Sequence, residues 1–215
     1  LGYLSEGANT AGAHLAGALP HREAGGAPVS AAGLAAAEML AGDLEALLLL
    51  GCEPELDIAA GEDVLNALDG IEFITCLTPY VTPAMRRYAD ALLPVGTAYE
   101  TSGTFVNCEG RWQSFTGSAS PVAETRPAWK VLRVLGTQLG IEGFDYMSSE
   151  EVRDDLRSRL GPAAAASPEV PLRAVQLRHE GAWEEPGPYA TDMLLRRSQP
   201  LQETKIGGAA RRRWS

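Results

Sequence analysis

Three cysteines have the clearest capacity for redox or metal chemistry in this sequence. Cys52, Cys76 and Cys108 are separated by 24 and 32 residues, and no two of them form a Cys-x-x-Cys pair. An iron–sulfur cluster is typically held by four thiolates, several of them closely spaced. An odd and sparse set is also unlike a disulfide framework and is typical of a reducing compartment. We therefore expect buried or incidental thiols, and no metal-binding residue.

Two turns could hold phosphate groups. In the first, Gly7-x-Asn9-x-x-Gly12 follows a short apolar segment and is similar to a dinucleotide-binding loop with Asn9 in place of the middle glycine. That glycine lets the backbone approach a pyrophosphate, so its replacement favours the alternative, an ordinary turn between a strand and a helix. In the second turn, residues 51–54, the chain leaves a predicted parallel strand at the end where open α/β sheets bind ligands.

The second turn is acidic. It contains Glu53, and Glu55 and Asp57 follow closely. Three carboxylates would repel a pyrophosphate by on the order of a few kcal/mol at short range in a partly buried site. We therefore predict no cofactor-binding residue at this turn.

Residues for acid–base or nucleophilic catalysis are scattered. His14, His21 and His179 do not have the spacing of a metal-binding helix, and Ser102 and Ser114 lack the G-x-S-x-G frame of a nucleophile elbow. We expect no catalytic residue among them.

The best-placed charges are Glu100, Glu109 and Arg111. Arg111 could bind an anion, or Glu109 and Arg111 could close a hairpin whose turn is formed by Asn107 and Gly110. The second interpretation is favoured, because Asn and Gly tolerate the positive φ angles of tight turns.

Alternating apolar runs and helical patterns must position these residues. They predict a doubly wound α/β fold with a parallel sheet. We expect strands near residues 1–5, 45–50, 71–76 and 91–94, with helices over residues 30–41, 61–68 and 82–89.

The pattern changes after Gly96. A hairpin over residues 104–113 is expected at the edge of the sheet, with Phe105 and Trp112 mostly buried. Helices follow over residues 128–139 and 148–161, the second opened by a capping box at residues 148–151. A proline-bearing linker over residues 162–171 and a strand over residues 172–177 complete the prediction. We divide the chain into an α/β domain, residues 1–160, and an extended segment, residues 161–215.

Composition excludes several classes of function. The net charge of −10 argues against nucleic acid binding. No apolar run approaches the ~20 residues of a membrane-spanning helix. The chain ends in a basic stretch at residues 211–213, which could contact anionic lipid or an acidic partner or could be a solvated tail; the solvated tail is favoured. The start at Leu1, inside an apparent motif, predicts a fragment of a longer polypeptide.

One segment has a recognisable family pattern. Residues 89–113 resemble the A-D-x-x-L-P … E-x-x-G-T-F-x-N-x-E-G-R-x-Q segment of the molybdopterin oxidoreductase superfamily. Residues 47–55 and 192–197 are similar to the large iron–sulfur subunit of respiratory NADH:quinone oxidoreductase, complex I. In molybdenum enzymes of the superfamily the turn equivalent to residues 51–54 usually reads G-x-N-P and helps to hold the guanine dinucleotide half of the cofactor; here Glu53 replaces the Asn.

The resemblance implies that this chain is the C-terminal part of that large iron–sulfur subunit. This part would serve as a scaffold, bind partner subunits and contain no redox centre. The [2Fe–2S] and [4Fe–4S] clusters would be bound by the N-terminal part of the intact subunit. The other peripheral-arm subunits would be partners, on the cytoplasmic side of the bacterial inner membrane, in an enzyme complex that couples electron transfer to proton translocation. Two alternatives stay open. One is a fragment of a molybdopterin-dependent formate dehydrogenase or nitrate reductase, and the other is a free-standing nucleotide-binding α/β protein.

Overall fold

The computed structural model describes residues 7–58, 62–161 and 189–206. The chain forms two compact units. Unit 1 contains residues 1–52 and 66–169, and unit 2 contains residues 53–65 and 170–215. The predicted strands at residues 1–5 and 172–177, the linker at 162–171, His179 and the basic end of the chain lie outside the described residues. The division at residue 160 stays a prediction.

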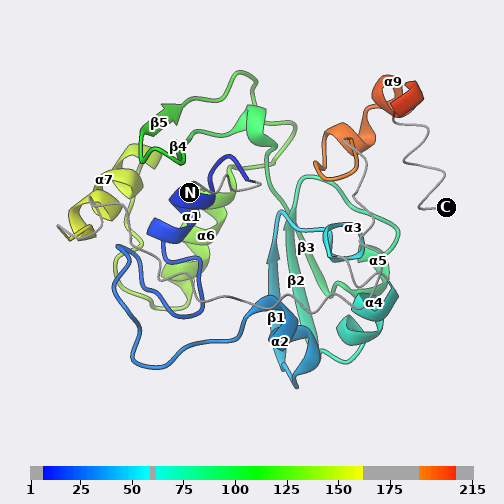
Figure 1. Ribbon diagram of the computed structural model, residues 1–215, viewed down its shortest axis with the longest axis horizontal. Helices are drawn as coiled ribbons and strands as arrows, with labels where there is room; N and C mark the ends of the chain where they lie inside the picture. Colours follow the sequence, from blue (N-terminus) through cyan, green and yellow to red (C-terminus); the bar gives the residue numbers. More distant parts are fainter. Residues whose placement is uncertain (1–6, 59–61, 162–188, 207–215) are drawn as a thin grey trace. The chain divides into compact units, whose positions relative to one another are not determined.

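Unit 1 contains a parallel three-stranded sheet, as the sequence predicts. Its order is β1 (Ala46–Leu50), β2 (Phe73–Thr78) and β3 (Ala91–Pro94), drawn side by side in Figure 1. The strand β2 begins and ends two residues later than expected. Its side chains form much of the core, because Ile74, Cys76 and Leu77 have no exposed surface. Asp90 ties the start of β3 to β2, since its Oδ2 accepts a hydrogen bond from the Ile74 amide at 2.7 Å.

Two helices near these strands are shorter than the sequence predicts. Helix α2 (Ala36–Ala41) does not begin at Ser30. The Gly33 amide instead donates to the carbonyl of Pro20 at 2.7 Å, which holds residues 30–35 in a non-helical path. Helix α4 spans Glu62–Leu68, in agreement with the prediction, whereas α5 is only Met85–Tyr88 in place of residues 82–89. Thr82 lies just before α5, and its Oγ1 accepts a hydrogen bond from the Met85 amide at 3.0 Å.

One face of the sheet is incompletely covered. Register pairs Leu48 with Thr75 and Leu50 with Leu77, so alternate residues of β1 and β2 share a face. On that face Leu48 is 43% and Leu50 46% exposed, and Phe73 is also exposed. A nearly continuous apolar run such as residues 45–50 is typical of a strand covered on both faces, but this face of β1 is open and presents apolar surface.

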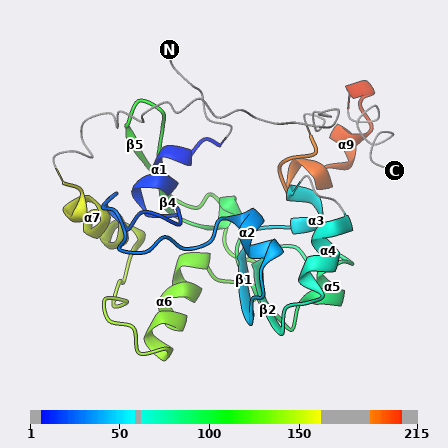
Figure 2. The ribbon, with the colours of Figure 1, turned by 60° about the horizontal axis from the view of Figure 1, so that its bottom comes forward.

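The antiparallel hairpin is confirmed, but its predicted surroundings are wrong. Strands β4 (Gly103–Val106) and β5 (Trp112–Phe115) form a separate sheet. Its main contacts are with α1 (Thr10–Leu15) and α7 (Ser149–Arg159), as Figures 1 and 2 show, and not with the edge of the parallel sheet. Phe105 is 42% exposed, although it packs edge to face on Phe115, whose ring lies on the same surface of the hairpin. Trp112 is half-buried beneath the Arg157 guanidinium.

Two helices follow the hairpin as expected. Helix α6 spans Ala128–Gln138, and α7 is capped by Ser148, whose Oγ accepts from the Glu151 amide. The Glu151 carboxylate accepts in turn from the Met147 amide at 2.6 Å. In unit 2 the described elements include α3 (Pro54–Asp57), the 3₁₀ turn η2 (Leu195–Arg197) and α9 (Gln199–Gln202).

Asn9 attaches α1 to the hairpin. Its Oδ1 accepts a hydrogen bond from the Val106 amide at 2.8 Å, and a Cβ at Gly12 would collide with the same oxygen. Gly12 therefore lets the side chain of Asn9 pass the helix and reach β4.

The Asn9→Ala variant should lose about 1–2 kcal/mol of unfolding free energy, because it leaves the Val106 amide without its acceptor. Chemical denaturation measures this loss, and amide hydrogen exchange at Val106 should become faster. Asn66→Ala, at an exposed position of α4, is the control and should change stability little. Equal effects of the two substitutions would contradict this role of Asn9.

Candidate functional site

The first possible phosphate loop is a structural turn. Asn9, which interrupts its glycine pattern, uses its side-chain oxygen to bind the backbone of β4. Helix α1 is only six residues long. The interpretation as an ordinary turn before a helix is therefore favoured by the contacts as well as by the sequence.

The cysteines lie on separate elements. Cys52 follows β1, Cys76 is buried in β2, and Cys108 is exposed in the hairpin turn. In the described ranges of the chain, no group of three or more His, Cys, Asp or Glu side chains is arranged to hold a metal ion. Within the same ranges, no helix has the length and apolar character needed to cross a membrane.

The hairpin charges act locally. Arg111 and Glu109 approach to 4.0 Å, and both side chains are largely exposed. Asn107 organises the turn, because its Oδ1 accepts from the amides of Glu109 and Arg111 at 3.0 and 2.9 Å. Gly110 has the positive φ of +77° that the turn requires. The hairpin-closing interpretation is confirmed, and a surface ion pair of this kind contributes little stability.

A buried ionic cluster in unit 2 is the most unusual feature of the chain. The side chain of Glu53 has no exposed surface. Its Oε1 lies 2.6 Å from Nη2 of Arg197. This contact is an ion pair, but its geometry is not that of a hydrogen bond. Its Oε2 accepts a hydrogen bond from Nη1 of Arg197 at 3.2 Å and lies 3.4 Å from Nη1 of Arg196. One carboxylate is thus shared by two guanidinium groups.

Asp57 completes the cluster. Its Oδ2 accepts from the Glu53 amide at 2.7 Å, and its Oδ1 lies 2.5 Å from Nη2 of Arg196. The arginines are positioned by Asp192, whose Oδ1 accepts from the amides of Leu194 and Leu195 at the start of η2. Two carboxylates and two guanidinium groups balance in charge, so the cluster is electrically neutral.

This arrangement tests whether the turn fits the guanine dinucleotide cofactor of molybdenum enzymes. The turn has a buried carboxylate in place of a neutral amide, and that carboxylate already contacts both arginines. Arg196 also contacts Asp57, so the cations that could neutralise a pyrophosphate are engaged within the chain. The residues present do not fit the cofactor.

Sequence reasoning found one half of this cluster and missed the other. The acidic turn alone predicts repulsion of a phosphate group, whereas Arg196 and Arg197 neutralise Glu53 and Asp57. The sequence contained one indication of this pairing, because the two adjacent arginines lie in a segment that resembles the same family as the turn. More than 130 residues separate them from the turn, so spacing alone could not pair them.

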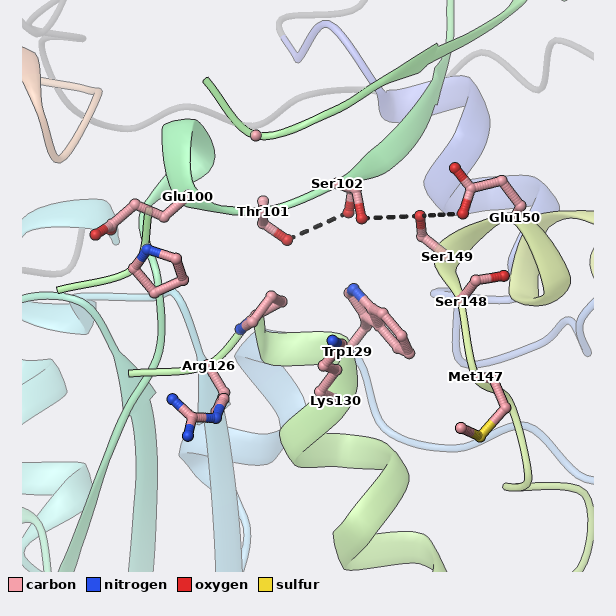
Figure 3. Close-up of a pocket in the computed structure, with 13 residues that line it drawn as sticks. Glu100, Thr101, Ser102, Arg126, Trp129, Lys130, Met147, Ser148, Ser149 and Glu150 are labelled. Carbon is pink, nitrogen blue, oxygen red and sulfur yellow. Dashed lines mark hydrogen bonds between the residues drawn. The ribbon is translucent and has the colours of Figure 1, made fainter. Parts of the chain in front are cut away.

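A cavity of about 410 Å³ lies in unit 1, and Figure 3 shows the side chains around it. Its walls are the segment before β4, the start of α6 and the start of α7. Glu100 closes one wall. Its carboxylate accepts from the Thr97 amide and hydroxyl, both at 2.8 Å, and from the Val122 amide at 2.9 Å. These hydrogen bonds lower the pKa of Glu100 below its ordinary value, led by the bond from the Thr97 backbone.

Comparison with known proteins decides the family. Residues 1–138 match molybdopterin oxidoreductase. The chain belongs to the molybdopterin oxidoreductase family. It is similar to a "Putative formate dehydrogenase" of Staphylococcus haemolyticus, with 26% identity over 115 residues, and to one of Staphylococcus aureus, with 27% over 124 residues. It is also similar to the alpha subunit of an NADPH-Fe(3+) oxidoreductase of Geobacter sulfurreducens, with 32% identity over 98 residues.

These matches cover part of each molecule. They include 54%, 58% and 46% of this chain, respectively, and 12% of the length of each relative. The family resemblance noted at residues 89–113 is thereby confirmed, and the parallel α/β architecture agrees with it. The family membership establishes an oxidoreductase relationship, and the complex I branch is a finer proposal.

Arg197→Gln should lower the unfolding free energy by about 3 kcal/mol, because it leaves the buried Glu53 with one cation fewer. Arg86→Gln, at an exposed position of α5, is the matched control and should have an effect below about 0.5 kcal/mol. Denaturant unfolding measures both. A stability loss no larger than that of the control would show that the cluster contributes nothing.

The hydrogen bonds of Glu100 should make its contribution to the free energy of unfolding sensitive to acid. Because its folded-state pKa lies below the ordinary value of 4.5, its contribution is present above that value and is lost as pH falls through the folded-state pKa. Glu100→Gln should therefore reduce the melting temperature at neutral pH and weaken its decline on acidification below about pH 4.5. Parallel pH profiles for the variant and the unsubstituted chain would contradict this assignment.

Proposed function

We propose that this chain is a scaffold and partner-binding part of the iron–sulfur subunit of an NADH:quinone oxidoreductase, complex I. It carries no redox centre, and the assembled complex transfers electrons from NADH to quinone with coupled proton translocation. The observation that carries this proposal is the buried contact of Glu53 with Arg196 and Arg197. The turn that would serve a cofactor in a molybdenum enzyme is used here for internal packing.

The cluster also links the two segments that resemble the complex I subunit. Glu53 lies in the first, residues 47–55, and both arginines lie in the second, residues 192–197. A buried carboxylate without cations would be strongly destabilising, and a buried arginine without a carboxylate equally so. The carboxylate and the arginines therefore depend on one another, and this mutual dependence supports a turn that is used for internal packing.

Protein contacts supply the rest of the proposed role. The exposed apolar side chains of Leu48, Leu50 and Phe73 share one face of the parallel sheet and suit burial against protein. The partners are peripheral-arm subunits of the complex, on the cytoplasmic side of the bacterial inner membrane. The [2Fe–2S] and [4Fe–4S] clusters belong to the N-terminal part of the intact subunit, and the chain alone is not catalytic.

A second candidate is a molybdopterin enzyme of the formate dehydrogenase or nitrate reductase type. The names of the staphylococcal relatives favour it. The contacts around Glu53 oppose it, because position 53 has a carboxylate in place of a neutral amide. Arg196 and Arg197, the cations at the turn, are already paired with Asp57 and Glu53.

Analysis of the full-length polypeptide that contains this chain separates the candidates. Elemental analysis should find iron without molybdenum, and acid extraction should release no guanine nucleotide from a pterin cofactor. Stoichiometric molybdenum together with a released guanine nucleotide would replace the proposal by the molybdenum enzyme. Iron in the full-length protein but not in the 215-residue chain would support a cluster-bearing region elsewhere.

A further inference from the structure

The cavity in unit 1 contains an unsatisfied donor. Nε1 of Trp129 is buried and has no hydrogen-bond acceptor among the described residues. Figure 3 shows the indole nitrogen directed toward the side of the cavity formed by Thr101 and Ser102. A buried donor without a partner costs about 1–3 kcal/mol, so an acceptor bound in the cavity would recover this energy.

Ser102 lies across the cavity from the indole. Its Oγ is 2.9 Å from Oγ of Ser149, whose single proton also faces the Glu150 carboxylate at 3.1 Å, so the Ser102 hydroxyl is engaged with α7. The hydroxyl and the indole N–H come from opposite walls, the segment before β4 and the first turn of α6.

The wall formed by α6 is positive. Lys130 lies in the first turn, with Nζ 5.3 Å from the centre of the Trp129 ring, and Arg126 precedes the helix. The N-cap is Pro127, which gives no side-chain cap, and the first turn contains no acidic residue. The positive end of the helix dipole and the first amide groups are therefore uncompensated by a side chain.

The acidic side chains at the cavity are engaged elsewhere. The Glu100 carboxylate accepts hydrogen bonds from Thr97 and Val122, and Figure 3 shows it pointing away from the other labelled side chains. Glu150 accepts from Oγ of Ser149 at 3.1 Å on the α7 side. The indole N–H and the cations thus lie at the α6 wall, and the carboxylates lie at the other walls.

We propose that this cavity binds a small molecule through a carboxylate or phosphate group. The oxyanion accepts a hydrogen bond from Trp129 Nε1, with Lys130 and Arg126 as the neighbouring cations. Charge-assisted hydrogen bonds of this type are the strong ones in proteins, and a cavity of about 410 Å³ admits a small metabolite. The site is independent of the Glu53 cluster and of the proposed function.

Titration of the 215-residue chain with sodium acetate and with inorganic phosphate, at constant ionic strength kept with chloride, tests the proposal. Calorimetry should detect saturable binding of at least one anion, and the one that binds identifies the group. In ¹H–¹⁵N spectra the indole N–H of Trp129 should shift on binding. The absence of saturable binding below about 10 mM, or an unchanged indole signal, would overturn the proposal.

Three variants separate a built site from general attraction to positive charge. Trp129→Phe keeps the ring but removes the donor and should weaken binding about tenfold. Lys130→Gln should weaken it by a few-fold, whereas Glu150→Gln should strengthen it by a few-fold because it removes a neighbouring negative charge. If Lys130→Gln weakens binding and Trp129→Phe does not, the anion is attracted to surface charge alone and the proposal is wrong.

Discussion

The buried carboxylate of Glu53 is the interaction on which the rest of this account depends. Removal of an ion from water costs several kcal/mol, and Glu53 has no exposed surface. The cost is met by Arg196 and Arg197, which come from the far end of the chain and are held by the turn at Asp192. The folding of unit 2 therefore requires residues 53–57 and 192–197 to assemble together. The arginines that neutralise the turn are also the groups that a phosphate ligand would need.

A family fold can be kept while the residues at one of its turns differ, because fold and site are separable. The parallel order of β1, β2 and β3 is kept here, and the core residues of β2 are fully buried. Other polar side chains serve as internal links. Asn9 binds the Val106 amide, and Asp90 binds the Ile74 amide. Both hydrogen bonds connect separate segments of the chain, so they help to define its tertiary structure.

Much of the described fold could be predicted from the sequence, because apolar periodicity and turn residues act locally. The run that became β1, the capping box at Ser148 and the hairpin turn at Asn107 are examples. Interactions between distant segments could not be predicted in the same way. The pairing of Glu53 with two arginines, the Gly33 bond that delays α2 and the cavity beside Trp129 all depend on tertiary packing. The exposure of Phe105 has the same cause, since the hairpin packs on α1 and α7 and not on the parallel sheet.

A double-mutant cycle between Glu53 and Arg197 tests the central claim most directly. The unfolding free energies of Glu53→Gln, Arg197→Gln, the double variant and the unsubstituted chain give the coupling free energy of the two side chains. A buried ion pair that holds unit 2 together predicts a favourable coupling of about 2 kcal/mol or more. The double variant should then lose less unfolding free energy than the two single variants lose together. Additive losses, with a coupling free energy near zero, would show that Glu53 and Arg197 do not depend on one another and would contradict the account.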